Sequence, residues 1–207
     1  MKPLTVEQER RLVQRLKQGD ERAFTMLVRT YQTPVYNLAF RMLSGSREDA
    51  LDVSQDIFVT VSRAIDGFRE QARLSTWIYR ITVNHCRNRI KYLARRKQSS
   101  HQAWDDTIER EQPNTSEAFL ASIPRPDALY EGQQAERFLQ TALNRLDPEQ
   151  REVVVLRDVQ GLSYEDIVRI TGHRLGTVKS RLHRGRVALS TAYRAWRSGT
   201  VPEETSS

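Results

Sequence analysis

The sequence contains a single cysteine, Cys86, and this scarcity excludes an internal disulfide. Such cysteine usage is typical of a reducing compartment, and a small thiol side chain of this kind favours a place in the core. No apolar run approaches the roughly 18 residues that a membrane-spanning helix needs. The first residues turn polar at once, which argues against a secretory signal peptide. We therefore expect a cytoplasmic protein without membrane insertion.

Acidic residues are missing from two long stretches of the chain. The sequence has 26 Asp and Glu residues, yet none of them lies within 71–104 or within 167–202. Each of these stretches holds eight Lys and Arg residues. Because chance rarely removes acids from a chain so rich in them, we interpret the stretches as two separate contacts with a polyanion. The alternative is a pair of solvated basic surfaces.

The sequence also lacks the alternation of a β-strand, whereas apolar residues recur at helical spacing in both halves. We predict an all-α fold with two small helical domains, 1–97 and 127–197. A flexible linker at 98–126, rich in Ser, Pro and acidic residues, joins them, and 198–207 forms a disordered tail. Asp20 and Asp147 are expected to cap helices, and Pro34 to start or kink one. The predicted helices cover 7–17, about 20–31, 34–43, 47–67, 75–93, 128–146 and a segment from Pro148.

The second basic stretch carries the pattern of a helix-turn-helix. Ser163 can cap a short helix, Gly172 suits the left-handed conformation that ends it, and a second helix is expected from about Thr177. A short helix, a glycine turn and a helix with a basic outer face are typical of a motif that enters the major groove of DNA. The alternative is an ordinary helical pair. The candidate DNA-binding residues are Arg174, Thr177, Lys179, Ser180, Arg181 and Arg184.

The first basic stretch predicts a different contact. On a helix over 75–93, one side is apolar, and the other combines cations, an amide and a large ring. Cations bind phosphates, an amide can read a base edge, and an indole can stack on an unpaired base. The pattern favours melted or single-stranded DNA, although Trp77 is equally compatible with core packing. The candidate residues are Trp77, Arg80, Asn84, Arg87 and Lys91.

Four segments, in this order, resemble the extracytoplasmic-function (ECF) sigma factors of the sigma-70 family. Residues 19–31 are similar to the opening helices of that family, and 49–58 to its polymerase-binding segment. Residues 75–84 resemble the segment that binds the −10 promoter element. The helix-turn-helix, at 161–167 and 176–182, resembles the one that binds the −35 element.

The resemblance implies a protein that binds core RNA polymerase and directs promoter-specific initiation, without enzymatic activity or a cofactor. It further implies contacts with the β′ clamp helices and the β flap, with promoter DNA, and with an anti-sigma factor in a stress or envelope response. The linker would thread the polymerase near the RNA path. The residues that would dock on the β′ clamp helices are Asp52, Gln55, Asp56 and Phe58.

One loop departs from the family's pattern. Relatives often carry Gly-Asp and a pair of aromatics before the tryptophan, where this chain has Glu70, Leu74 and Ser75. The resemblance therefore does not identify the −10 base that this loop would capture.

A stand-alone helix-turn-helix regulator would leave the acidic segment 52–58 unexplained. A metal-dependent nuclease is disfavoured because the four histidines have no second ligand at metal-binding spacing.

Overall fold

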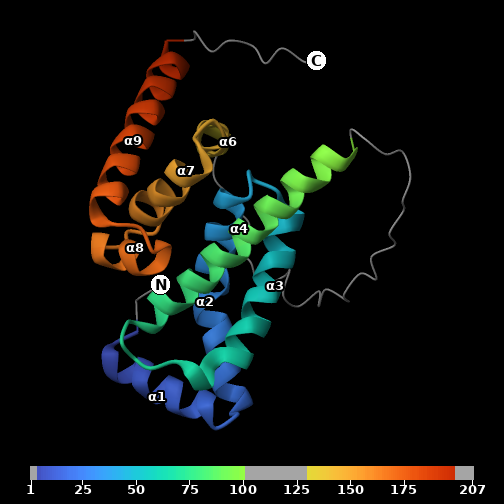
Figure 1. Ribbon diagram of the computed structural model, residues 1–207, viewed down its shortest axis with the longest axis vertical. Helices are drawn as coiled ribbons and strands as arrows, with labels where there is room; N and C mark the ends of the chain where they lie inside the picture. Colours follow the sequence, from blue (N-terminus) through green and yellow to red (C-terminus); the bar gives the residue numbers. More distant parts are fainter. Residues whose placement is uncertain (1–3, 101–129, 199–207) are drawn as a thin grey trace. The chain divides into compact units, whose positions relative to one another are not determined.

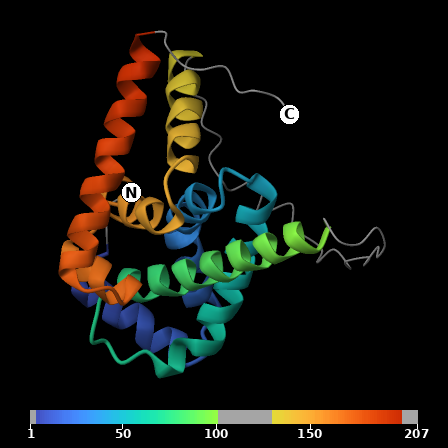
Figure 2. The same cartoon turned by 45° about the horizontal axis from the view of Figure 1, so that its top comes forward.

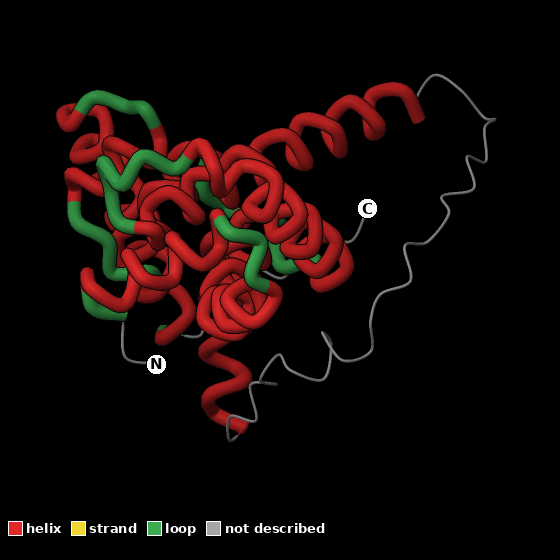
Figure 3. The backbone as a smooth tube through the Cα atoms, turned by 90° about the horizontal axis from the view of Figure 1, so that it is seen from below, coloured by secondary structure: helices red, strands yellow, loops and turns green. Residues whose placement is uncertain are grey.

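The chain divides into two helical units, Met1–Ala128 and Leu129–Ser207. The structure, a computed structural model, describes residues 4–100 and 130–198. Every regular element in these two ranges is a helix, and Figure 3 shows no strand among them. The expected all-α fold is confirmed. Most of the expected linker and tail lies outside the described residues.

Residues 4–100 of the first unit form four α-helices and one short 3₁₀ turn. They are α1 (Val6–Lys17), α2 (Glu21–Met42), α3 (Arg47–Ala64), η1 (Ile65–Gly67) and α4 (Leu74–Ser100). Local side chains fix the starts of three of them. Thr5 forms a capping box with Gln8, Asp20 accepts from the amides of α2, and Ser46 caps α3. The expected cap at Asp20 is confirmed, whereas Asp147 occupies the N-cap position of the helix that begins at Pro148 without accepting a capping hydrogen bond.

The core of the first unit lies between α2, α3 and α4, which lie against one another in Figure 1. Leu27 of α2, Ile57 of α3 and Ile78 of α4 are completely buried. Cys86 is also buried, as its size predicted. Arg89 of α4 donates from Nε to Asp49 of α3 at 2.7 Å, so a partly buried ion pair joins these helices.

Two features of this unit differ from the sequence-based expectation. Pro34 lies inside one continuous helix, α2, rather than between two helices. The hydrogen bond that proline cannot donate is a small loss beside the burial of Tyr31, Val35 and Leu38 along the same helix. The second difference is that α4 continues to Ser100 and takes in the first residues of the expected linker.

The second unit contains α6 (Tyr130–Asn144), α7 (Pro148–Val154), the π-helical turn η2 (Val155–Val159), α8 (Tyr164–Thr171) and α9 (Leu175–Arg197). Figure 2 shows α6 beside the C-terminal half of α9. Ser163 caps α8, and Gly172 ends it with φ +74°, as predicted. Helix α9 begins at Leu175, two residues before the expected start, so Arg174 occupies its N-cap position.

Two buried contacts fix the helices of this unit. The guanidinium of Arg151 donates to the carbonyl oxygens of Leu143 and Asn144, both at 2.9 Å, and so satisfies the end of α6. Burial lowers the pKa of Arg151 from its ordinary value. At the crossing of α9 over α7, a Cβ on Gly185 would come within 2.6 Å of the Val154 Cγ2 atom. Glycine is therefore required where these two helices meet.

Candidate nucleic-acid interfaces

Helix α4 presents the basic face that the sequence predicts. Arg80, Asn84 and Lys91 are exposed, and Arg87 is half-buried beside them. The opposite side of the helix is buried, with Ile78, Thr82 and Cys86 of the predicted inner face and also Tyr79 and Val83. Because the core fixes the inner side of α4, its cations and amide are held in one row on a rigid support.

Trp77 lies at the start of this row. Its environment combines the two that were expected, packing against the core and access to an unpaired base. Its side chain is half-buried, and its ring centroid lies 5.2 Å from that of Phe68 with the planes tilted by 46°. Phe68 itself is buried. One side of the indole therefore packs on the unit while part of its surface stays accessible, which is the arrangement that stacking on an unpaired base requires.

Helix α9 presents the second basic face. Lys179, Ser180 and Arg184 are exposed, Thr177 is half-buried, and Arg174 is exposed at the N-cap. His183 is also exposed, and it follows Lys179 and Ser180 by four and three positions, so it shares their face. His183 is not among the DNA-binding residues predicted from the sequence, where the histidines were candidates for metal ligands only. Its helical spacing from Lys179 was the signal that could have placed it on this surface.

Arg181 is a predicted DNA-binding residue whose side chain is largely shielded from solvent. Only 16% of it is exposed, and its Nη2 group donates to the carboxylate of Glu149 on α7. Arg186, on the same helix, donates from Nε to Asp158 at 3.0 Å, and this hydrogen bond raises the pKa of the Arg186 guanidinium. Both arginines pair with acids that precede the acid-free stretch. Part of the positive charge of α9 is therefore used to hold the helix in place.

The acidic surface predicted for polymerase lies on α3. Asp56 is exposed, while Asp52 and Gln55 are half-exposed. Phe58 is only 5% exposed and belongs to the core of the first unit. The exposed apolar residue of this helix is instead Val59, at 48%. An apolar side chain beside carboxylates and an amide suits a protein contact with a polar rim.

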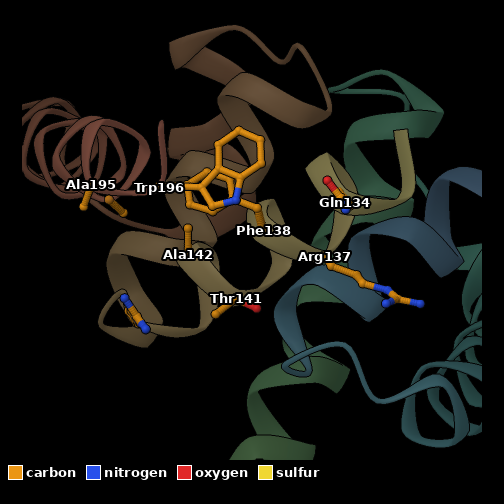
Figure 4. Close-up of a pocket in the computed structure, with 9 residues that line it drawn as sticks. Gln134, Arg137, Phe138, Thr141, Ala142, Ala195 and Trp196 are labelled. Atoms are coloured by element: carbon orange, nitrogen blue, oxygen red, sulfur yellow. The ribbon is translucent and has the colours of Figure 1, made fainter. Parts of the chain in front are cut away.

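A hollow of about 390 Å³ lies between α6 and the C-terminal part of α9. Its floor is aromatic, because the Phe138 and Trp196 rings stack with centroids 4.7 Å apart. Figure 4 shows these two rings together, with Arg137 pointing away from them. Tyr193 extends the aromatic cluster and is exposed. The hollow is separated along α9 from the basic face at 179–184.

Neither a cluster of metal ligands nor a membrane-spanning helix is found in the part of the chain that the structure describes. In residues 4–100 and 130–198, no group of three or more His, Cys, Asp or Glu side chains is placed to hold a metal ion. Within the same ranges, no helix has the length and apolarity needed to cross a membrane.

Comparison with known proteins gives the family of this chain. The family model of sigma-70 region 2 matches residues 27–99, and that of sigma-70 region 4 matches residues 138–189. The chain is 36% identical over 178 residues to the ECF RNA polymerase sigma-E factor of Escherichia coli K12, with 86% of this chain and 90% of the relative covered. This chain is an ECF sigma factor of the sigma-70 family.

A second relative agrees with this assignment, and two solved structures share the fold. The sigma factor is 34% identical over 189 residues to the RNA polymerase sigma-H factor of Pseudomonas aeruginosa, covering 91% of this chain and 95% of the relative. Its fold resembles CnrH in complex with the cytosolic domain of CnrY, at 24% identity and a TM-score of 0.64, covering 90% and 97% of the two chains. It likewise resembles RpoE in complex with the anti-sigma factor NepR from Bartonella quintana, at 24% identity and a TM-score of 0.64, covering 83% and 96%.

The family assignment decides between the functional classes left open by the sequence. The matches to region 2 and region 4 fall in the first and second unit, respectively, so both basic stretches belong to one sigma factor. A stand-alone helix-turn-helix regulator is not favoured. Sigma factors are initiation factors rather than enzymes, which confirms the expectation that the chain is not an enzyme.

Proposed function

We propose that this sigma factor binds core RNA polymerase and uses its two units to recognise two promoter elements in different states of the DNA. The observation that supports this proposal is the pair of exposed basic faces on α4 and α9, each fixed from behind by a buried core. The faces differ in chemistry. Only the α4 face combines its cations with a part-exposed tryptophan and an amide, as capture of unpaired bases requires.

The α4 face would bind the melted −10 element. Arg80, Arg87 and Lys91 contact phosphates, Asn84 reads a base edge, and Trp77 stacks on an unpaired base. Binding that favours the melted strand over the duplex shifts the equilibrium towards the open promoter. The polymerase catalyses RNA synthesis, and the sigma factor recognises the promoter sequence and captures the melted strand.

The α9 face would bind the −35 element in the major groove. Lys179, Ser180, His183 and Arg184 form the outer surface of the second helix of the motif, and Thr177 and Arg174 lie at its start. Arginine and lysine at such positions donate to guanine or to phosphates. Arg181 contributes by holding α9 against α7 through Glu149, and a base contact of Arg181 would require this pair to open.

Two further surfaces would bind the polymerase. Asp52, Gln55 and Asp56, with Val59, form the contact for the β′ clamp helices, and Phe58 supports this surface from the core. The aromatic hollow between α6 and α9 is the candidate contact for the β flap. Its residue Trp196 lies 12 positions beyond Arg184, or about 18 Å along the helix, so both contacts can be made at once.

The cellular setting follows from the same proposal. The protein would act in the cytoplasm, where core polymerase and promoter DNA are found, and an anti-sigma factor would control it. The expected linker, 98–126, of which 98–100 belong to α4, would run through the polymerase near the RNA path.

In vitro transcription on a promoter library tests this proposal directly. The purified sigma factor is added to core polymerase, and transcript starts are mapped by sequencing. We expect starts downstream of a shared pair of −35 and −10 motifs, which disappear when either the sigma factor or core is left out. Sequence-specific duplex binding by the free protein, with no effect on start-site selection, would instead support the stand-alone regulator.

A further inference from the structure

Segment 68–73 leads into α4, and residues of the N-terminal helix α1 contact both ends of this segment. At one end, the Lys17 Nζ atom donates to the carbonyl oxygen of Phe68 at 2.8 Å. At the other end, the Arg73 guanidinium donates from Nε to Oε2 of Glu9 at 2.8 Å and from Nη2 to Oε1 at 3.0 Å. Nη2 of Arg73 also donates to the carbonyl oxygen of Leu4 at 2.7 Å. Segment 68–73 is therefore held by side chains remote in sequence.

Glu9 is the unusual member of this set because its carboxylate is nearly buried. Only 10% of the Glu9 side chain is exposed, whereas 45% of Arg73 is exposed. Burial, followed by the nearby charge of Glu9, raises the pKa of Tyr31 above its ordinary value, so the carboxylate lies close to the core of the unit. A buried carboxylate with two charged hydrogen bonds to one guanidinium fixes its partner in both position and orientation.

Both ends of the held segment contact Trp77. The carbonyl oxygen of Arg73 accepts the first main-chain hydrogen bond of α4, from the amide of Trp77 at 3.1 Å. The ring of Phe68 packs against the Trp77 indole. Between these ends, Glu70 adopts a positive φ of 54°, which is uncommon for a residue other than glycine. The conformation of 68–73 thus depends on contacts outside it, and it sets the start of α4 and the site of the indole.

We propose that Glu9 is a positioning residue for −10 recognition, acting through Arg73 on segment 68–73 and Trp77. This inference rests on the proposed function of the α4 face. Glu9 does not touch DNA, since an almost buried carboxylate would repel phosphates and cannot reach a base. Glu9 selects the conformation of segment 68–73 in which the exposed part of Trp77 is presented to the melted strand. Helix α1 therefore controls base preference without contacting the DNA.

The test measures base preference with the complete holoenzyme. Core polymerase is loaded with wild-type protein, Glu9→Gln or Arg73→Gln, and binding is measured to single-stranded oligonucleotides that carry the −10 motif or one substitution at each of its positions. The matched control is Glu7→Gln, because Glu7 pairs only within α1, with Arg11, and is 66% exposed. Affinity for core and the thermal midpoint are recorded for each variant.

We expect Glu9→Gln to reduce the preference for the motif over its substituted forms by about fivefold or more, with affinity for core unchanged. Glu7→Gln should retain the wild-type preference. If Glu9→Gln fails to fold, Arg73→Gln decides, because a glutamine amide at position 73 can still donate one hydrogen bond to the nearly buried Glu9 carboxylate, whereas the paired contact of the guanidinium is lost. A wild-type preference in the folded Glu9→Gln variant, or in Arg73→Gln when Glu9→Gln does not fold, overturns the inference.

The salt dependence separates positioning by Arg73 from a direct contact with DNA. A lost phosphate contact weakens binding on all sequences and reduces the slope of log affinity against log salt by about one. Positioning predicts an unchanged slope with a changed base preference, and the reverse result for Arg73→Gln overturns the inference. A wild-type holoenzyme without any −10 preference would contradict the proposed function itself, and the role of Glu9 with it.

Discussion

Arg181 of α9 pairs with Glu149 in the first turn of α7, although 32 positions separate them in the chain. The Nη1 group of Arg181 is buried, and it has no hydrogen-bond partner among the described residues. The guanidinium therefore lies between two helices, with one amino group committed to an acid and the other shielded from water. Such a group supports the helix-turn-helix from behind.

We predict that Arg181→Ala lowers the free energy of unfolding by about 1–2 kcal/mol, because charged hydrogen bonds contribute at this level and the exposure of Glu149 reduces the effect. Affinity for DNA should fall by the same factor for every variant of the −35 element, so that the base preference is unchanged. Arg184→Ala, which removes an exposed cation from the same helix, should leave stability unchanged. Denaturant titrations and binding to a panel of −35 variants check both. Unchanged stability with relaxed preference at one base pair would instead identify Arg181 as a base-reading residue.

Gly185→Ala should destabilise the protein by about 1–3 kcal/mol, because the added Cβ would overlap the Val154 side chain and force α9 away from α7. Gly176→Ala is the matched control, since no atom lies within 4 Å of the position of its Cβ and alanine favours a helix. Urea-induced unfolding of the two variants gives the comparison. Equal stabilities would show that α7 and α9 can move apart without loss.

Trp77→Ala should impair promoter opening much more than binding to core polymerase. Loss of one stacked base costs about 1–3 kcal/mol, which corresponds to a decrease of roughly 5- to 150-fold in the equilibrium constant for promoter opening. Permanganate footprinting of the melted region and a separate binding assay with core measure the two quantities. On a template that is already melted, formation of the open complex should recover only in part, because the variant also lacks the stacking contact with the unpaired strand. Opening at the wild-type level would remove Trp77 from the mechanism.

Asp20 should make stability depend on pH in the acid range. The hydrogen bond from Arg15, with those from the α2 amides, lowers the pKa of Asp20 from its ordinary value of 3.8. The folded state thus favours the charged carboxylate. The resulting stabilisation is present above the unfolded value and is lost as the pH falls below about 3.8 through the folded pKa. Urea unfolding of wild type and Asp20→Asn should give a stability difference that shrinks below this pH. A difference independent of pH would exclude this linkage.

Local chemistry made much of the fold predictable from the sequence. Asp20 and Ser163 cap helices because a short side-chain oxygen before an apolar periodic segment can accept from the first free amides. Gly172 ends α8 because glycine adopts a positive φ without steric cost. The buried side of α4, including Ile78 and Cys86, followed from its period. These signals involve residues within one or two helical turns of each other.

What could not be predicted depends on contacts between distant parts of the chain. Phe58 lies in a helix with an apolar and an acidic side, and only the packing of that helix decides that Phe58 is buried and Val59 exposed. The pairs of Arg181 with Glu149 and of Arg73 with Glu9 join residues 32 and 64 positions apart, beyond the reach of any periodicity. The continuity of α2 through Pro34 likewise rests on tertiary burial.

The close crossing at Gly185 has a consequence for how promoter preference can diverge among related proteins. The inner surface of α9 is fixed in depth by Val178, Leu182 and the glycine contact, whereas the side chains of Lys179 and His183 project into solvent. Exchanges at such solvent-facing positions usually change folding stability by about 0.5 kcal/mol or less. Single substitutions at these exposed positions can therefore change the base preference of α9 one position at a time, while the packing of the helix against α7 stays constant.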